Sequence, residues 1–373
     1  MIIHFSLLAI ILLCCLVWGS GESDWIIENR LKGKRVIGSL APYVLIFGYI
    51  TFIAAMRTNV NDSGVYRRDF LMVTSSLSAI SEELSNFNIQ YSFSRIIVIL
   101  FKHFVSTNYH VYFGVYAAVE SIIIVHVLRE ESVSFFDTAY YLFASSLYVN
   151  YLTMMRQWAA VVLVFSGIHA LAEQRPLEFV VHCAIAGLFH PSAFLMIPVY
   201  FLVQGKSWSL KQFIIIVTFG ILMVYMNPIL SSMGELLDGS TYDYVIVKMQ
   251  TSTGSSWIRI MIAAVPVVLS YLYGREDNDP VANICTNMAL ISLLLTILAT
   301  FTSGLYVIRF TTYFTIFNLI LYPYLLNVSI KDDEQIKGII KPLFYILFFA
   351  LYFYSMRHVN GFRYTSDVLG TFN

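Results

Sequence analysis

Apolar stretches that could each cross a membrane follow one another along almost the whole chain. A helix needs about 20 mainly apolar residues to span a bilayer core. Only 12% of the residues are charged and 58% are hydrophobic, whereas a soluble protein is about 25% charged. Because this shortage of charge extends from end to end, we expect an all-α integral membrane protein, a polytopic bundle of about 12 transmembrane helices. The candidate spans are 2–18, 40–56, 110–128, 135–153, 156–172, 178–190, 191–204, 212–230, 257–273, 283–302, 305–327 and 341–356.

The chain has neither an internal repeat nor a low-complexity linker that would divide it. Residues 1–373 are therefore expected to form one polytopic membrane domain. The first apolar run resembles a secretory signal peptide in length. It has no Lys or Arg before it and no clear cleavage site after it, so we interpret it as a retained first helix.

Short basic segments predict which ends of the helices share a side of the membrane. The run Arg30–Arg35 holds four cations and is expected to be cytoplasmic. The same side would then hold Arg175, Lys206, Lys211, Arg275, Lys331 and Lys337. The two longest connections, 57–109 and 231–256, then form outer-face loops, and 93–105 is expected to be an amphipathic helix at the interface. Since loops on a rigid scaffold carry function, the chemistry is expected on the outer face.

Three polar motifs stand at the outer ends of apolar helices under this topology: Arg156-Gln157, His190-Pro191-Ser192 and Arg309. Arginine and histidine beside helix N-termini favour an anionic ligand. Pro191 suits the first position of a helix, which places His190 at its mouth. Each motif also has a structural reading. Arg156 could anchor the interface beside Trp158, His190 could be an N-cap, and Arg309 could snorkel to the headgroups.

A further polar run follows the second span and contains Arg57, Asp62 and Tyr66. Its Asn-Asp-Ser-Gly sequence is typical of a turn, so a solvated loop remains an alternative to a binding role. The C-terminal run 357–364 is expected to be a solvated terminus, with closure over a site as the alternative. These two segments alone do not decide between binding and simple exposure.

The sequence argues against several function classes. A net charge of zero gives no basic surface for nucleic acid. The four cysteines lie in apolar runs without the spacing of a zinc site. Glu120 is the one carboxylate well inside a predicted span, which disfavours ion-coupled transport, since such transport relies on carboxylate relays. No metal ligands and no cofactor motif are found at the outer face.

The motifs resemble those of a known family. The run 150–160, with its Met-Arg-Gln-Trp-Ala-Ala, and the run 186–193, with its Phe-His-Pro-Ser-Ala, are similar to the EpsG family of Wzy-like exopolysaccharide and O-antigen polymerases. The outer motifs of that family are resembled by Arg57, Asp62, Tyr66, Arg309, Tyr313 and Phe314. Asn61 departs from the pattern, since the family has Gly before its Asp. The resemblance covers roughly residues 40–330.

The resemblance implies a GT-C-like membrane glycosyltransferase. It would join polyprenyl-pyrophosphate-linked oligosaccharide repeat units on the outer leaflet of the bacterial inner (cytoplasmic) membrane, with its active site facing the periplasm or exterior. Its partners would be the lipid-linked glycan, the lipid bilayer, and a chain-length regulator and flippase of the same pathway. No nucleotide sugar, metal, cofactor or nucleic acid is implied.

The roles expected from the resemblance follow from the charge of the leaving group. Cations placed at the departing pyrophosphate would lower the barrier. The acceptor hydroxyl needs a base, and His190 is preferred over Asp62. The expected pyrophosphate-binding residues are Arg57, Arg156, Gln157 and Arg309. Other substrate contacts are expected from Tyr66, Ser192 and Tyr313.

Two other functions remain open from the sequence. The first is a flippase or exporter of the same lipid-linked glycan, which would need a wide cation-lined cavity and no acceptor site. The second is another outer-face transferase, such as an acyltransferase or a relative of O-antigen ligases. Formation of a polymer ladder would distinguish the polymerase from both.

Overall fold

The computed structural model describes residues 2–32, 34, 36–225, 256–301, 304–330, 334–358 and 362–371. The described chain is helical and contains no strand, only two isolated bridges. Its elements are α1 (Ile2–Leu31), α2 (Ala41–Met56), α3 (Ser63–Met72), α4 (Ser78–Ser85), α5 (Ser92–Phe104), α6 (Tyr109–Glu131), α7 (Phe135–Ala144), α8 (Val149–Thr153), α9 (Met155–Phe165), α10 (Ile168–Ala172), α11 (Pro176–Phe189), η1 (Pro191–Leu195), α12 (Met196–Val203), α13 (Leu210–Val224), α16 (Trp257–Tyr273), α17 (Pro280–Phe301), α18 (Gly304–Thr315), α19 (Asn318–Tyr324), η2 (Leu325–Ser329) and α20 (Glu334–His358).

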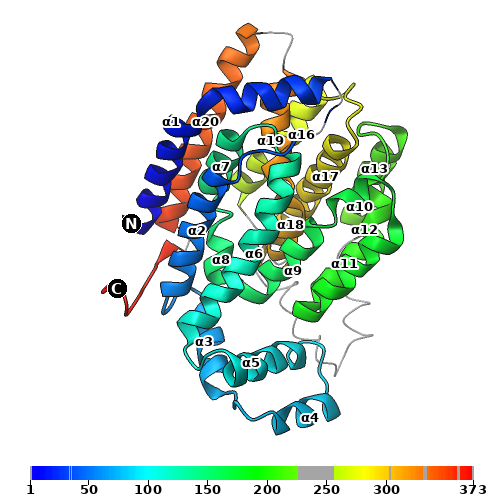
Figure 1. Cartoon of the computed structure of the whole chain (residues 1–373). Helices are drawn as coiled ribbons and strands as arrows, with labels where there is room; N and C mark the ends of the chain where they lie inside the picture. Colours follow the sequence, from blue (N-terminus) through cyan, green and yellow to red (C-terminus); the bar gives the residue numbers. More distant parts are fainter. Residues whose placement is uncertain are drawn as a thin grey trace.

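The long apolar helices pack side by side into one bundle (Figure 1). α2 lies along α6, α9 along α11, and α17 between α16 and α18. The first and last helices, α1 and α20, lie together on one flank, where Phe5 and Phe353 are in ring contact with centroids 5.9 Å apart. The largest apolar core runs through nearly all of these helices. The all-helical architecture predicted from the sequence is therefore confirmed, and its apolar helices are consistent with a membrane protein.

Fewer helices than predicted are long enough to span a membrane without a break. In the described part of the chain, α6, α17 and Gln335–His358 of α20 have the required length and apolar character, and α1 adds a fourth if its bent halves form one span. The count of twelve is not confirmed. Two predicted spans are broken by serines whose hydroxyls bond to the preceding helical turn: Ser145 to Tyr141 and Ser166 to Leu163. Such bonds compete with the helical backbone.

The predicted loop 57–109 is largely helical. It folds into α3, α4 and α5, which lie across one end of the bundle (Figure 1). α5 spans Ser92–Phe104 and coincides with the predicted amphipathic segment. We call this end of the molecule the α5 end. The other predicted loop, 231–256, falls outside the described residues except for Ser256, which caps α16.

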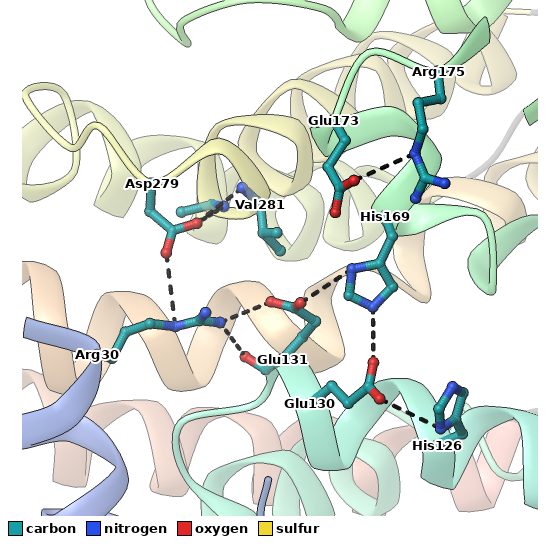
Figure 2. A network of polar contacts seen from close by, with 10 residues as sticks. Arg30, His126, Glu130, Glu131, His169, Glu173, Arg175, Asp279 and Val281 are labelled. Carbon is teal, nitrogen blue, oxygen red and sulfur yellow. Dashed lines mark hydrogen bonds and ion pairs between the residues drawn. The ribbon is translucent and has the colours of Figure 1, made fainter. Parts of the chain in front are cut away.

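The opposite end of the bundle is held by a cluster of charged side chains, which we call the Arg30 cluster (Figure 2). Arg30 of α1 bonds to Glu131 of α6 at 2.8 Å, and its Nε lies 3.7 Å from Asp279 before α17. His169 of α10 contacts Glu131 and the neighbouring Glu130. Of the basic residues assigned to one side by charge, Arg30 and Arg175 lie near each other at this end (Figure 2).

Candidate active site at the α5 end

The first contact of the site joins the segment after α2 to α18. Asp62 stands at the N-cap position of α3, and its Oδ2 accepts a hydrogen bond of 2.6 Å from Nη2 of Arg309. Gln157, in the first turn of α9, donates from Nε2 to the Arg309 carbonyl at 2.9 Å. Both members of the ion pair keep about one-third of their side chains exposed, 35% and 34%. Arg309 is thus anchored from two directions and remains accessible to a ligand.

A second contact chain starts at His190, which lies between α11 and η1. Pro191 is the first residue of η1, as the sequence predicts. His190 Nδ1 lies 2.7 Å from Ser192 Oγ, and that hydroxyl lies 3.0 Å from the Tyr313 hydroxyl of α18. The imidazole is therefore fixed through a hydroxyl pair that reaches the helix carrying Arg309.

Arg156 opens α9 and is held by the segment that covers the α5 end. Its Nη1 donates to the Gln90 carbonyl at 2.9 Å. The guanidinium carbon lies 5.7 Å from the Tyr66 ring centroid and 5.4 Å from that of Tyr91, within cation–π range. Burial raises the pKa of the Tyr66 hydroxyl, against the lowering effect of Arg156, so this phenol stays a hydrogen-bond donor at neutral pH.

Electrostatics links the motifs into one site. Burial, together with the smaller effect of the positive charges on Arg156 and Arg309, lowers the pKa of His190 to about 4. Tyr66 interacts with Asp62, Arg156 and Arg309 together. A neutral imidazole thus stands beside two permanent cations at pH 7. Such a set can bind an anion and accept a proton in the same place.

The sequence predicts that Arg57 contacts the ligand directly, whereas the structure buries its side chain. Only 1% of it is exposed, its guanidinium carbon lies 4.2 Å from the Phe113 ring centroid, and it donates to the Ala54 carbonyl. Its charge interacts with Glu120 and Tyr66. Arg57 is therefore a buried neighbour of the exposed site. The motif that contains it gave no sign of this burial, because a helix-end arginine is normally expected to reach the headgroups.

The C-terminal tail packs against the start of the polar run, although the sequence predicted a solvated terminus. Thr365 exchanges backbone hydrogen bonds with Thr58 and Asn59, at 2.9 Å and 3.2 Å. Asp367 accepts a hydrogen bond from Thr58 and another from Tyr109, and these contacts lower the pKa of its carboxyl to about 2. The tail thus holds the segment that ends at Asp62. No sequence signal links positions about 300 residues apart.

Other residues in the region of α3, α5 and α6 also line the site, and no sequence pattern predicted them. Tyr91, Arg95 and Tyr112 line a 260 Å³ cavity with Tyr66 and Arg156. Within the described ranges, no three His, Cys, Asp or Glu side chains lie close enough together to hold a metal ion. The site as built offers two guanidinium groups, a carboxylate, an imidazole and several hydroxyls.

Only one of the comparisons with known proteins finds a match. No curated protein and no solved structure matches the chain, so the GT-C-like likeness stays a prediction. A family model described as the EpsG family matches residues 40–366, a range that contains every predicted site residue. The match begins just before α2 and ends in the docked C-terminal tail. On this match over most of its length, the chain belongs to the EpsG family.

Proposed function

We propose that the protein is a membrane polymerase that joins oligosaccharide repeat units carried on polyprenyl pyrophosphate. Membership of the EpsG family suggests an exopolysaccharide or O-antigen polymerase-like function. The observation that carries the proposal is the meeting of four separate segments at the α5 end. Asp62 pairs with Arg309, Gln157 bonds to the same residue, and the hydroxyls beside His190 reach α18.

The donor's pyrophosphate binds to Arg156 and Arg309 in this proposal. Each guanidinium carries five N–H donors, and Asp62 uses one of those on Arg309, so several remain for phosphate oxygens. Negative charge grows on the pyrophosphate as its bond to the sugar breaks. Cations already in place stabilise that charge without rearranging at the moment of reaction. The buried Arg57 adds a more distant positive charge beside Tyr66.

His190 is the proposed general base. An acceptor hydroxyl oxygen forms a bond to the anomeric carbon of the donor, the carbon–oxygen bond to pyrophosphate breaks, and His190 takes the hydroxyl proton. Nδ1 accepts a long hydrogen bond of 3.4 Å from the Ser192 backbone N–H, which makes His190 the N-cap of η1, and it also lies 2.7 Å from Ser192 Oγ. The proposed step uses the other neutral tautomer, in which Nδ1–H donates to Oγ and Nε2 has the free lone pair. The lowered pKa keeps the imidazole unprotonated before the reaction.

Asp62 is the other candidate base, and its contacts favour a different role. Its Oδ2 is already engaged by Arg309 at 2.6 Å. A carboxylate held in this way orients the guanidinium through a charge-assisted hydrogen bond. Asp62 is therefore assigned to position Arg309. Tyr66 and Ser192 are assigned to hydroxyl contacts with the substrate. Tyr313, also expected to contact the substrate, is fully buried and instead positions the Ser192 hydroxyl, 3.0 Å away.

The proposed site faces the outer side of the bacterial cytoplasmic membrane. In support, the α5 end carries the folded segment 57–109, and the other end carries the Arg30 cluster, with Arg175 of another basic segment close by. Lipid-linked repeat units delivered by a flippase would reach the α5 end, and a chain-length regulator would act on the same product. The coverage of the site by α3 and α5 suits an enzyme that must keep water from a glycosyl donor.

A reconstituted assay tests the proposed function. Purified protein in liposomes is mixed with its lipid-linked repeat unit, and the products are separated by gel. The proposal predicts a ladder of polymers from the wild type and none from Arg156→Ala inserted at equal amounts. Transport of intact lipid-linked units without a ladder would contradict the proposal and favour the flippase.

A further inference from the structure

An apolar groove lies next to the candidate site. Its volume is 370 Å³, and it lies between α5, α6, α9 and α11. Its lining includes Ile97, Phe101, Tyr112, Val119, Ile185 and Phe189. Its one carboxylate, Glu120, is 3% exposed and interacts electrostatically with Arg57. We call this feature the apolar groove.

The groove and the cavity around Arg156 share one lining residue. Tyr112 lines both. Its ring packs against Phe101 with centroids 5.1 Å apart, so it forms a wall between a space lined by arginines and an apolar one. A molecule with an anionic head and an apolar tail could therefore occupy both spaces by passing this ring.

Two chain segments lead from the charged residues directly into the groove. Arg156 is in the first turn of α9, and Ala159, Val162 and Leu163 on the next two turns line the groove. At 1.5 Å of rise per residue, this wall extends about 10 Å from Arg156. On the other side, the lining residue Phe189 immediately precedes His190.

The groove opens toward the lipid-facing surface of the bundle. Val119 of α6 and Ile185 of α11 line it and are about half exposed, at 52% and 45%. In a membrane-embedded protein, exposed apolar side chains on such helices face hydrocarbon. A long chain bound at its first units in the groove can therefore continue into the bilayer without crossing a polar surface.

We propose that the apolar groove binds the pyrophosphate-proximal isoprene units of the donor's polyprenyl chain, with the pyrophosphate beside Arg156. This inference rests on the proposed function and deepens it. The aromatic rings of Phe101, Tyr112 and Phe189 offer flat faces to the double bonds of an isoprenoid. Fixing these first units places the anomeric carbon beside His190, so the groove positions the donor for reaction.

Binding of undecaprenyl phosphate to purified protein in detergent tests the groove. Val119→Trp fills the groove from a half-exposed position, and we expect it to weaken binding about tenfold or more, since losing two buried CH₂ contacts has that effect. Ile185→Trp is a second variant that fills the groove from α11 in case the first does not fold. Ile122→Trp is the matched control, because Ile122 is on the same helix and lines a separate cavity against α2.

Inorganic pyrophosphate serves as the probe without a tail. Both groove variants are expected to bind it as the wild type does. Unchanged undecaprenyl phosphate affinity in both folded groove variants would overturn the proposal. Competition by phosphatidylglycerol as effective as that by undecaprenyl phosphate would also overturn it, because the groove would then be a general site for acyl chains.

The same variants in the ladder assay separate this inference from the proposed function. If the wild type makes polymer and Val119→Trp binds and polymerises normally, the groove assignment is wrong and the polymerase stands. If the wild type makes no polymer and Val119→Trp still loses affinity for undecaprenyl phosphate, the groove is right and the transferase is wrong. Each result therefore decides one of the two proposals.

Discussion

Replacing Arg309 by alanine is expected to remove catalysis and leave folding nearly intact. The guanidinium pairs with Asp62 at 2.6 Å, and both side chains are about one-third exposed. A pair with this much water around it contributes about 0–1 kcal/mol to stability, because solvent screens the attraction. The bond from Gln157 goes to the backbone carbonyl of residue 309, so it survives the substitution.

The effect on turnover is expected to be much larger. Removing one preplaced donor from a site that stabilises developing negative charge costs about 10²–10³-fold in rate, or about 2.7–4 kcal/mol. Arg309→Lys should fall between the wild type and alanine, since lysine keeps the charge and loses the planar fork. The expected loss of rate is therefore much larger than the expected loss of stability. The ion pair of Arg309 is exposed and adds little to folding, whereas its charge acts directly on the leaving group.

The assay compares polymer formed per unit time by equal amounts of protein in liposomes, with melting in detergent as the measure of stability. Arg175→Ala is the matched control. Arg175 is also a partly exposed arginine in ion pairs, with Glu173 at 3.3 Å, and lies away from the α5 end. Wild-type rates and chain lengths from Arg309→Ala would refute the reasoning. A loss of stability well above 1 kcal/mol would show that Arg309 is a folding residue.

Three further predictions concern other parts of the molecule. His190→Ala should lower turnover about 10²–10⁴-fold with unchanged donor affinity. In the wild type, kcat/KM should fall at acidic pH with a midpoint near the lowered His190 pKa of about 4. A midpoint near the ordinary histidine value of 6.5 would contradict the buried base. Asp367→Ala should release the tail, seen as faster hydrogen exchange of the Thr365 amide, and unchanged exchange would show that the carboxyl does not hold it. Glu131→Gln should lower the unfolding free energy by about 3–5 kcal/mol, because it breaks a buried pair with Arg30, while turnover per folded molecule stays normal.

The helix starts that carry the site could be read from the sequence. Arg156 and His190 are polar residues at the boundaries of apolar runs, where a helix must begin, and both are found at the start of helical elements. Charge in an apolar chain is easy to detect because it is rare and costly. The placement of Arg30 and Arg175 at the same end is consistent with the rule that short basic segments share a side of the membrane.

The remaining features depend on tertiary packing. Hydropathy does not reveal that a span breaks at Ser145–Ser146, where Ser146 takes a φ of 66°. The burial of Arg57 on Phe113 depends on a helix far along the chain. The walls around Arg156 come from Gln90 and Tyr91, which no pattern marks as functional. These contacts are non-local, and a local sequence pattern carries no information about them.

Release of polyprenyl pyrophosphate by the purified protein is the most direct test of the central claim, that Arg156, Arg309 and His190 act together on one leaving group. Lipid products and glycan length are measured in the same liposomes by mass spectrometry. We expect one polyprenyl pyrophosphate to be released for each repeat unit joined, and both products to be lost together in Arg309→Ala. Intact lipid-linked units crossing the membrane with no pyrophosphate release, or release without any glycan growth, would contradict it.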